Sequence, residues 1–150
     1  MKKMVWFDMD GTIANLYAVD DWLSMLRAFD ETPYAEAEVM LNMSLLARYL
    51  NKLQKIGYQI GIISWLSKCS TPEYDEKVTG AKLNWLSTHL ASVHFDEVLI
   101  VEYGTPKQNF MVTEEDILFD DEEQNRENWN GEAFTPAEIM SVLKELLQQE

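Results

Sequence analysis

The chain has 150 residues, of which 47% are hydrophobic and 25% are charged, and these values suit one globular domain with a real hydrophobic core. Its formal net charge of −14 repels polyanions, which argues against nucleic acid polymers and anionic membranes as partners. A small phosphate ester stays compatible with this charge if a bound cation offsets the local field. The single cysteine, Cys69, excludes an internal disulfide, and no apolar run reaches the roughly 20 residues of a membrane-spanning helix. We therefore expect a cytoplasmic protein.

Four short apolar runs predict the strands of a buried sheet. They are Met4–Phe7, Ile60–Ile63, Val98–Val101 and Ile117–Phe119. Each run is too short for a helix and lacks strict alternation, which is typical of strands that are buried on both faces. Residues Glu132–Phe134 are a candidate for a short fifth strand.

Helical patterns separate these runs. Apolar residues recur every three or four positions over Val39–Leu53, and Gly57 follows as a stop signal. The leucines of Leu83–Leu90 mark a second helix. Residues Thr135–Glu138 form a capping box with proline at the first helical position, and the apolar stripe of Ile139–Leu147 follows it.

Strands that alternate with helices predict right-handed crossovers and a parallel sheet covered on both faces. The segment from about Asn15 to Thr32 does not fit this alternation. Its apolar spacing predicts an amphipathic helix through Val19, Trp22, Leu23, Leu26 and Phe29. We interpret residues 1–150 as a single domain with a small helical cap inserted at about 15–45. Such an insertion would lie over the carboxyl ends of the strands, where open α/β sheets bind ligands.

Polar residues that could take part in catalysis or metal binding stand at the ends of the predicted strands or just before one. In chain order they are Asp8, Asp10, Ser64, Lys107, Asp120 and Asp121. Because the carboxyl ends of parallel strands meet at one edge of a sheet, these residues can converge on a single site.

Such a cluster suits phosphate chemistry. Several carboxylates make a site of hard oxygen ligands, for which Mg²⁺ is the usual occupant. One carboxylate can attack phosphorus to form an aspartyl-phosphate, while a second protonates the leaving alkoxide and later deprotonates water. A metal, a lysine and a hydroxyl can hold the phosphoryl oxygens, and Gly11 permits a sharp turn with exposed backbone N–H groups.

The motifs DMDGT, IIS and LFDD, together with the lysine of YGTPKQNF, resemble the four-motif set of the haloacid dehalogenase-like hydrolases. The resemblance covers the chain from Met4 to about Trp129. It implies a three-layer α/β/α Rossmann-like fold in which the Asp8 strand lies between the strands that end in Ser64 and Asp120.

The resemblance also implies a role for each motif residue. The implied catalytic residues are Asp8, as the nucleophile, and Asp10, as the general acid and base. The implied phosphate-binding residues are Gly11, Thr12, Ser64 and Lys107, of which Thr12 also helps to fix the aspartate pair. The implied ligands of Mg²⁺ are the Asp8 side chain, the Asp10 backbone carbonyl and Asp120, with Asp121 supporting them from behind.

Within that superfamily, the segments FDMDGTIANLY, AKLNWLSTHL, FDEVLIV and DDEEQNRENW followed by GEAF are similar to 5'(3')-deoxyribonucleotidase-like proteins. This similarity implies a nucleoside monophosphate, especially a deoxynucleotide, as the substrate. The chain is shorter than those nucleotidases, chiefly in the cap, which supplies their base and sugar contacts. A phosphatase or phosphotransferase for another small metabolite therefore stays open, as do a catalytically silent binding module and a homodimer formed through the cap.

The aromatic residues divide between core and cleft. We expect Trp85 and Trp129 to pack in the core. Tyr17 and Trp22 in the cap and Trp65 after Ser64 are candidates for lining the substrate cleft. A partly exposed loop is the alternative for Trp65.

Overall fold

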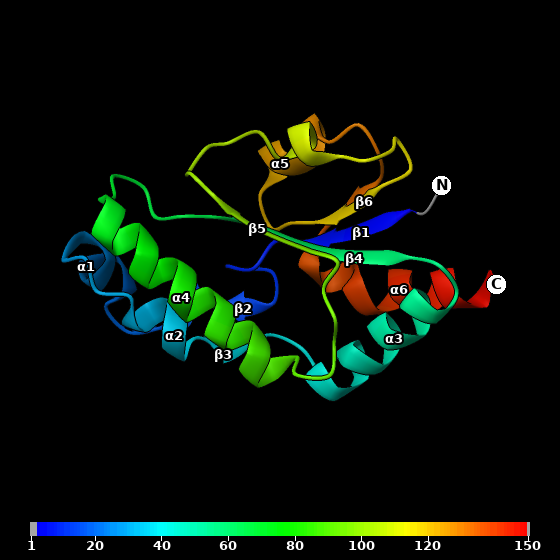
Figure 1. The fold of residues 1–150 in the computed structure, drawn as a ribbon, viewed down its shortest axis with the longest axis horizontal. Coiled ribbons are helices and arrows are strands. Elements are labelled where there is room, and N and C mark those ends of the chain that lie inside the picture. Colours follow the sequence, from blue (N-terminus) through cyan, green and yellow to red (C-terminus); the bar gives the residue numbers. More distant parts are fainter. Residues whose placement is uncertain (1–2, 150) are drawn as a thin grey trace.

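A computed structural model describes residues 3–149 and contains a main sheet of five parallel strands in the order β5-β4-β1-β6-β7 (Figure 1). The strands are β1 (Met4–Phe7), β4 (Gln59–Trp65), β5 (Glu97–Val101), β6 (Ile117–Phe119) and β7 (Ala133–Phe134). All five were predicted, four of them from apolar runs, and the central place of β1 between β4 and β6 is confirmed.

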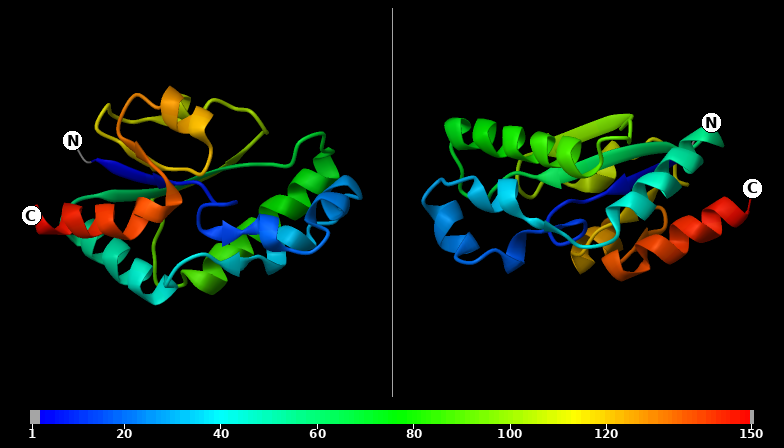
Figure 2. Two further views of the ribbon diagram at one scale, coloured as in Figure 1. Left: turned by 180° about the vertical axis from the view of Figure 1, so that it is seen from behind. Right: turned by 90° about the horizontal axis from the view of Figure 1, so that it is seen from below.

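Helices cover both faces of this sheet, so the predicted α/β/α layering is confirmed (Figures 1 and 2). One face carries α3 (Met43–Lys55), α4 (Pro72–His89) and α6 (Ile139–Gln148). The other carries α5 (Glu123–Asn128) and the 3₁₀ turn η2 (Lys107–Phe110). Because side chains alternate along a strand, Val5 and Phe7 pack in the core below the three helices, whereas Met4 and Trp6 pack on the opposite face.

A buried aspartate fixes the loop that crosses this second face. The carboxylate of Asp116 accepts hydrogen bonds from the Met4 N–H (3.2 Å) and the Trp6 indole (3.2 Å) on β1. It also accepts hydrogen bonds from the Val112 N–H (2.7 Å) and the Thr113 hydroxyl (3.1 Å). A fully buried carboxylate is stable only with such partners, and here they tie the chain after η2 to the central strand.

The chain between β1 and α3 forms the cap segment, residues 16–37. It contains the 3₁₀ turn η1 (Leu16–Ala18), α1 (Trp22–Arg27) and α2 (Thr32–Glu36). A small antiparallel pair of β2 (Ala14–Asn15) and β3 (Glu38–Val39) flanks it. The cap segment lies along α4, at the end of the molecule opposite the Met4 end of β1 (Figures 1 and 2).

Two tyrosines fasten the cap segment to the rest of the domain. The Tyr34 hydroxyl donates to Ser67 Oγ (3.2 Å), in the loop after β4, and the Tyr74 hydroxyl of α4 donates to the Asp30 carbonyl (2.8 Å). Burial raises the pKa of both tyrosines, so that their hydroxyls remain neutral donors.

Some predicted boundaries were wrong. Val39 was predicted in a helix but pairs with Ala14 in the small sheet, and the helix begins at Met43 because the Asn42 side chain caps it by accepting from the Leu45 N–H (3.1 Å). The predicted cap helix is shorter than its apolar spacing suggested, since α1 spans six residues.

Other local predictions were right. Gly57 ends α3 with a positive φ of 107°, and the capping box of Thr135 and Glu138 is present. Trp85 and Trp129 are core residues, whereas Leu83 is 45% exposed. Within the described part of the chain, no helix combines the length and the apolar character that crossing a membrane requires.

Candidate active site

The first strand leads directly into a tight loop that presents two carboxylates. The N–H groups of Thr12, Ile13 and Ala14 all donate to the Met9 carbonyl, at 3.1, 3.0 and 2.9 Å. Gly11 makes this turn possible with a φ of +80°, a conformation that residues with a Cβ rarely adopt. The loop holds Asp8 at the carboxyl end of β1 and Asp10 just beyond it.

Asp8 is buried, and each of its carboxylate oxygens has a polar partner. One of its oxygens accepts from the Thr12 hydroxyl (2.9 Å), and the other lies 3.0 Å from the ammonium of Lys107. Asp8 follows Met4 and Trp6 in the strand alternation, so it faces the side of the sheet on which η2 carries Lys107. The predicted convergence of Asp8 and Lys107, 99 residues apart, is thus present in the structure.

Lys107 also binds the carboxylate that follows β6. Its ammonium lies 2.6 Å from Asp120 Oδ2, which also accepts from the Asn125 amide (3.2 Å), while Asp120 Oδ1 accepts from the Glu122 N–H (2.9 Å). Burial alone would lower the pKa of Lys107, but the charges of Asp8 and Asp120 more than offset it, so its pKa is raised and the ammonium stays charged.

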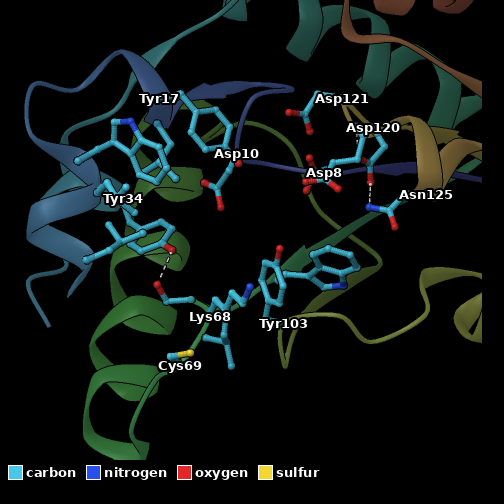
Figure 3. A pocket seen from close by; sticks show the side chains of 18 of the residues that line it. Asp8, Asp10, Tyr17, Tyr34, Lys68, Cys69, Tyr103, Asp120, Asp121 and Asn125 are labelled. Carbon is cyan, nitrogen blue, oxygen red and sulfur yellow. Dashed lines mark hydrogen bonds between the residues drawn. The ribbon is translucent and has the colours of Figure 1, made fainter.

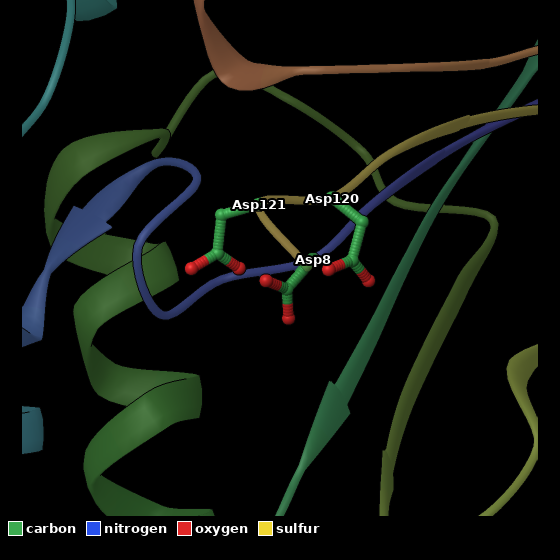
Figure 4. Close-up of side chains that lie close together, drawn as sticks. All are labelled: Asp8, Asp120 and Asp121. Carbon is green, nitrogen blue, oxygen red and sulfur yellow. The ribbon is translucent and has the colours of Figure 1, made fainter. Parts of the chain in front are cut away.

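Asp121 completes a cluster of three carboxylates. One oxygen from each of Asp8, Asp120 and Asp121 lies within 4.8 Å of the others (Figure 4). Burial, together with the charge of Asp8, raises the pKa of Asp120 to about 6 and that of Asp121 to about 8. The structure therefore places Asp121 inside the cluster, although the motif resemblance implied a supporting place behind it.

The donor set of this cluster fits a divalent cation. Carboxylate oxygens are the ligands that Mg²⁺ prefers, and crowded acids with raised pKa values are relieved when a cation binds between them. When Asp8, Asp10, Asp120 and Asp121 are all ionised, they carry more negative charge than the neighbouring Lys82 and Lys107 offset, and a bound cation would correct this imbalance.

Asp10 is held by a different lysine, Lys82 of α4. The Lys82 ammonium lies 2.9 Å from Asp10 Oδ2, 2.6 Å from Ser64 Oγ and 2.7 Å from the Trp65 carbonyl. Burial raises the pKa of Asp10, against the opposing charge of Lys82, and so favours the protonated acid. Lys82 was missed in the sequence, although it stands four residues from Val78 and from Leu86 on the buried face of α4, where a lysine is unusual.

The two aspartates open into a cavity of about 510 Å³ between the carboxyl ends of the strands and the cap segment. Figure 3 shows Asp10 between Tyr17 and Tyr34 on one side of the cavity and the cluster of Asp8, Asp120 and Asp121 on the other. Its volume and mixed lining are ordinary for a small-molecule site.

Aromatic side chains form much of the cavity wall. Tyr17 and Trp22 of the cap meet edge to face with their centroids 4.9 Å apart, and Trp65 and Tyr103 pair 5.0 Å apart on the core side. The predicted candidates Tyr17, Trp22 and Trp65 thus all line the cavity, and Tyr34 joins them. Trp65 is held in place by its indole, which donates to the Thr105 carbonyl (2.8 Å).

The structure does not bring every candidate residue to the cavity surface. Lys107 lines the cavity, but Ser64 is fully buried and its hydroxyl is occupied by Lys82. Thr12 is buried as well, with its hydroxyl donating to Asp8 and accepting from the Asp121 N–H (3.2 Å). Both hydroxyls therefore lie behind the carboxylates in this structure.

No protein-family model and no curated protein matches the sequence. Among solved structures, the chain is similar to the crystal structure of D,D-heptose 1,7-bisphosphate phosphatase from Burkholderia thailandensis, with a TM-score of 0.52 and 17% sequence identity. The match covers 84% of this chain and 70% of that chain. At this identity the likeness shows the fold alone. The chain has an α/β fold shared with a known phosphatase.

Proposed function

We propose that the chain is a magnesium-dependent phosphatase that hydrolyses a small phosphomonoester through an aspartyl-phosphate at Asp8. The observation that carries this proposal is the separate support of two carboxylates at one cavity, Asp8 by Lys107 and Asp10 by Lys82. A nucleophile and a general acid need different environments, and two lysines on opposite faces of the sheet supply them.

In the first step, a carboxylate oxygen of Asp8 attacks phosphorus while the bond between phosphorus and the leaving oxygen breaks. The electron pair of that bond stays on the leaving oxygen, and the protonated Asp10 carboxyl gives it a proton. The products are the free alcohol, an aspartyl-phosphate and the Asp10 carboxylate. The raised pKa of Asp10 supports its part as the acid.

In the second step, the Asp10 carboxylate takes a proton from water as the water oxygen attacks phosphorus. The bond between phosphorus and the Asp8 oxygen breaks, which restores the Asp8 carboxylate and releases inorganic phosphate. Lys107 lines the cavity 3.0 Å from Asp8, where its ammonium can neutralise phosphoryl oxygens in both steps.

Mg²⁺ would be held by the carboxylate cluster and the Asp10 carbonyl, and when bound it supplies charge that stabilises the phosphoryl group. Both Asp120 oxygens already accept hydrogen bonds, from Lys107, Asn125 and the Glu122 N–H. Both Asp8 oxygens are occupied in the same way, by Thr12 and Lys107, so these contacts do not rank the two residues. We therefore assign the ligand role to Asp8, Asp120 and Asp121 together, with Asp120 also orienting Lys107. The motif resemblance implied Asp8 and Asp120 as the side-chain ligands, with Asp121 only supporting them.

For the substrate we retain a nucleoside monophosphate, with deoxynucleotides first. Aromatic side chains stack on nucleic acid bases with little regard to sequence, and Tyr17, Trp22, Tyr34, Trp65 and Tyr103 line the cavity beside the reacting groups. The runner-up is a phosphorylated sugar or a related metabolite, because the fold is shared with a protein named as a heptose bisphosphate phosphatase.

Replacing the nucleophile tests the mechanism. We expect Asp8→Asn to abolish phosphate release from p-nitrophenyl phosphate, a loss on the order of 10³-fold or more, because an amide cannot form the covalent intermediate. The control is Asp20→Asn, which makes the same charge change at an exposed position. Phosphatase activity of Asp8→Asn at the wild-type level would show the mechanism to be wrong.

A panel of phosphomonoesters tests the substrate assignment. Steady-state rates with Mg²⁺ should favour deoxynucleoside monophosphates over sugar phosphates in kcat/KM. Activity without any preference for nucleotides would contradict the nucleotidase assignment and leave a general phosphatase. Folded protein that releases no phosphate from any ester would instead favour the silent binding module.

A further inference from the structure

Lys82 is a buried cation with an unusual set of partners. It lies within α4 with 1% of its surface exposed, and all three ammonium contacts go to the carboxyl ends of neighbouring strands. Burying an ammonium is costly unless its hydrogen bonds are satisfied. Here the partners are Asp10, the Ser64 hydroxyl and the Trp65 carbonyl, which together exhaust the donors of the ammonium.

The two lysines of the site differ in their access to a ligand. Lys107 lines the cavity, whereas Lys82 does not. The Asp10 carboxylate stands between Lys82 and the cavity, with 15% of its side chain exposed. Lys82 therefore reaches a bound ester through Asp10, not by direct contact.

The remaining contacts of Lys82 make its position rigid. Ser64 and Trp65 are the last two residues of β4, beside the central strand β1, and the Tyr34 ring lies 4.9 Å from the ammonium on the cap side. Tyr34 is itself held by its hydrogen bond to Ser67. A cation fixed from the sheet, the helix and the cap gives the carboxyl group of Asp10 one preferred direction.

We propose that Lys82 is a positioning residue that orients the Asp10 carboxyl group toward the leaving-group oxygen. This inference rests on the proposed phosphatase function. It gives the two lysines different roles, because Lys107 acts on the attacking side of the phosphoryl group whereas Lys82 acts on the side from which the alcohol departs. Loss of Lys82 should thus impair proton donation selectively.

The test compares two leaving groups. Nitrophenolate departs from phosphorus without a proton, whereas an alkoxide needs one, so only the alkyl ester depends on the orientation of Asp10. In Lys82→Met we expect kcat/KM for a nucleoside or simple alkyl phosphate to fall about 10-fold to 10²-fold, and kcat/KM for p-nitrophenyl phosphate to fall less than about 3-fold. For each ester, kcat/KM covers substrate binding and formation of the aspartyl-phosphate and does not include its later hydrolysis.

Matched variants control the comparison. Lys77→Met changes an exposed lysine of the same helix and should leave both rates unchanged. In an Asp10→Asn background, Lys82→Met should no longer alter the ratio between the two esters, because the residue that Lys82 orients has lost its proton. Where Lys82→Met does not fold, Lys82→Gln carries the same comparison.

The outcomes are distinct. Equal losses on both esters, or a ratio that still changes in the Asp10→Asn background, would overturn the positioning role in favour of a direct or structural one. An unchanged ratio in the folded single variant would overturn it too. Wild-type protein that releases phosphate from neither ester would contradict the proposed function, a result that differs from all of these.

Discussion

Gly11 shows how much of the site depends on one residue without a side chain. Its φ of +80° carries the chain from Asp8 and Asp10 into the turn around the Met9 carbonyl. A Cβ at this position would run into the Asp121 carboxylate and come within 3.0 Å of the Tyr17 ring. The glycine therefore leaves room for the loop after β1 to meet a carboxylate from the end of β6.

We predict that Gly11→Ala loses both stability and activity. The positive φ costs about 1–2 kcal/mol for a residue with a Cβ, and displacement of Asp121 should lower kcat/KM at least about 10-fold. Gly104→Ala is the matched control, since Gly104 has a φ of +87° with nothing within 4 Å of a new Cβ. Similar losses of stability with equal activities in the two variants would contradict the prediction.

The raised pKa values predict how stability depends on pH in the absence of metal. Because the folded-state pKa values of Asp120 (about 6) and Asp121 (about 8) exceed the ordinary value of 3.8, both groups destabilise the fold when ionised. The melting temperature in chelator should therefore rise as the pH falls from 9 to 6. Asp121→Asn should flatten this dependence, and exposed Glu102→Gln should not. An equal slope in both variants would refute the assignment.

At the level of single residues, the sequence predicted the acids better than the groups that hold them. Strand ends and motif spacing predicted Asp8, Asp10, Asp120 and Lys107, because parallel strands align their carboxyl ends at one edge of the sheet. The contact of Lys82 with Asp10 spans 72 residues and depends on how α4 lies against the sheet. The only local signal was a lysine in register with Val78 and Leu86.

Among the elements, α4 combines three roles in one helix. It covers the sheet through Trp85, docks the cap segment through Tyr74, and carries Lys82. Its N-terminus is capped by the Thr71 hydroxyl, which accepts from the Tyr74 N–H (3.2 Å), and proline occupies the first position.

Gly80 lies in the interior of α4, where neither a positive φ nor a close contact requires a glycine, so Gly80→Ala should stabilise the protein. Gly80 is exposed, and a Cβ there meets nothing within 4 Å. Alanine in a helix interior is favoured over glycine by about 0.5–1 kcal/mol, which urea unfolding can measure. Gly131→Ala should do the opposite, because its Cβ would collide with the backbone carbonyls of Asp116 and Glu114. A destabilising effect of Gly80→Ala would contradict this account of the helix.

The elements themselves were predictable where the pattern was local. The predicted runs Met4–Phe7 and Ile117–Phe119 match the observed strands residue for residue. A short apolar run without strict alternation is too short for a helix and is typical of a strand buried on both faces. The cap segment was less predictable. Asp30 accepts from the Thr32 N–H where α2 begins, and Asn42 caps the start of α3 after the cap segment, and apolar spacing carries no record of such contacts.

Across the whole molecule, negative charge predominates, whereas the site contains two buried lysines. A net charge of −14 spreads a negative field over the surface, yet Lys82 and Lys107 are both buried, next to Asp10 and Asp8. Under the proposed function, a phosphorylated molecule would approach against this field, and attraction within the cavity would come from Lys107 and from a cation held by the carboxylate cluster. This charge distribution disfavours the binding of large polyanions by itself, without a steric barrier.

The double role of α4, which docks the cap segment and carries Lys82, affects how this protein can evolve. Tyr34 of the cap lies against Lys82, and Lys82 lies against Asp10, so under the proposed function the cap wall of the cavity is in contact with the residue that holds the proton donor. A mutation that reshapes this part of the cap for a new ligand would then also disturb proton transfer. New substrate preferences would therefore be more accessible on the far wall at Tyr103, which pairs with Trp65, than at Trp65 itself, whose carbonyl accepts from Lys82 and whose ring lies 5.2 Å from the Lys107 ammonium.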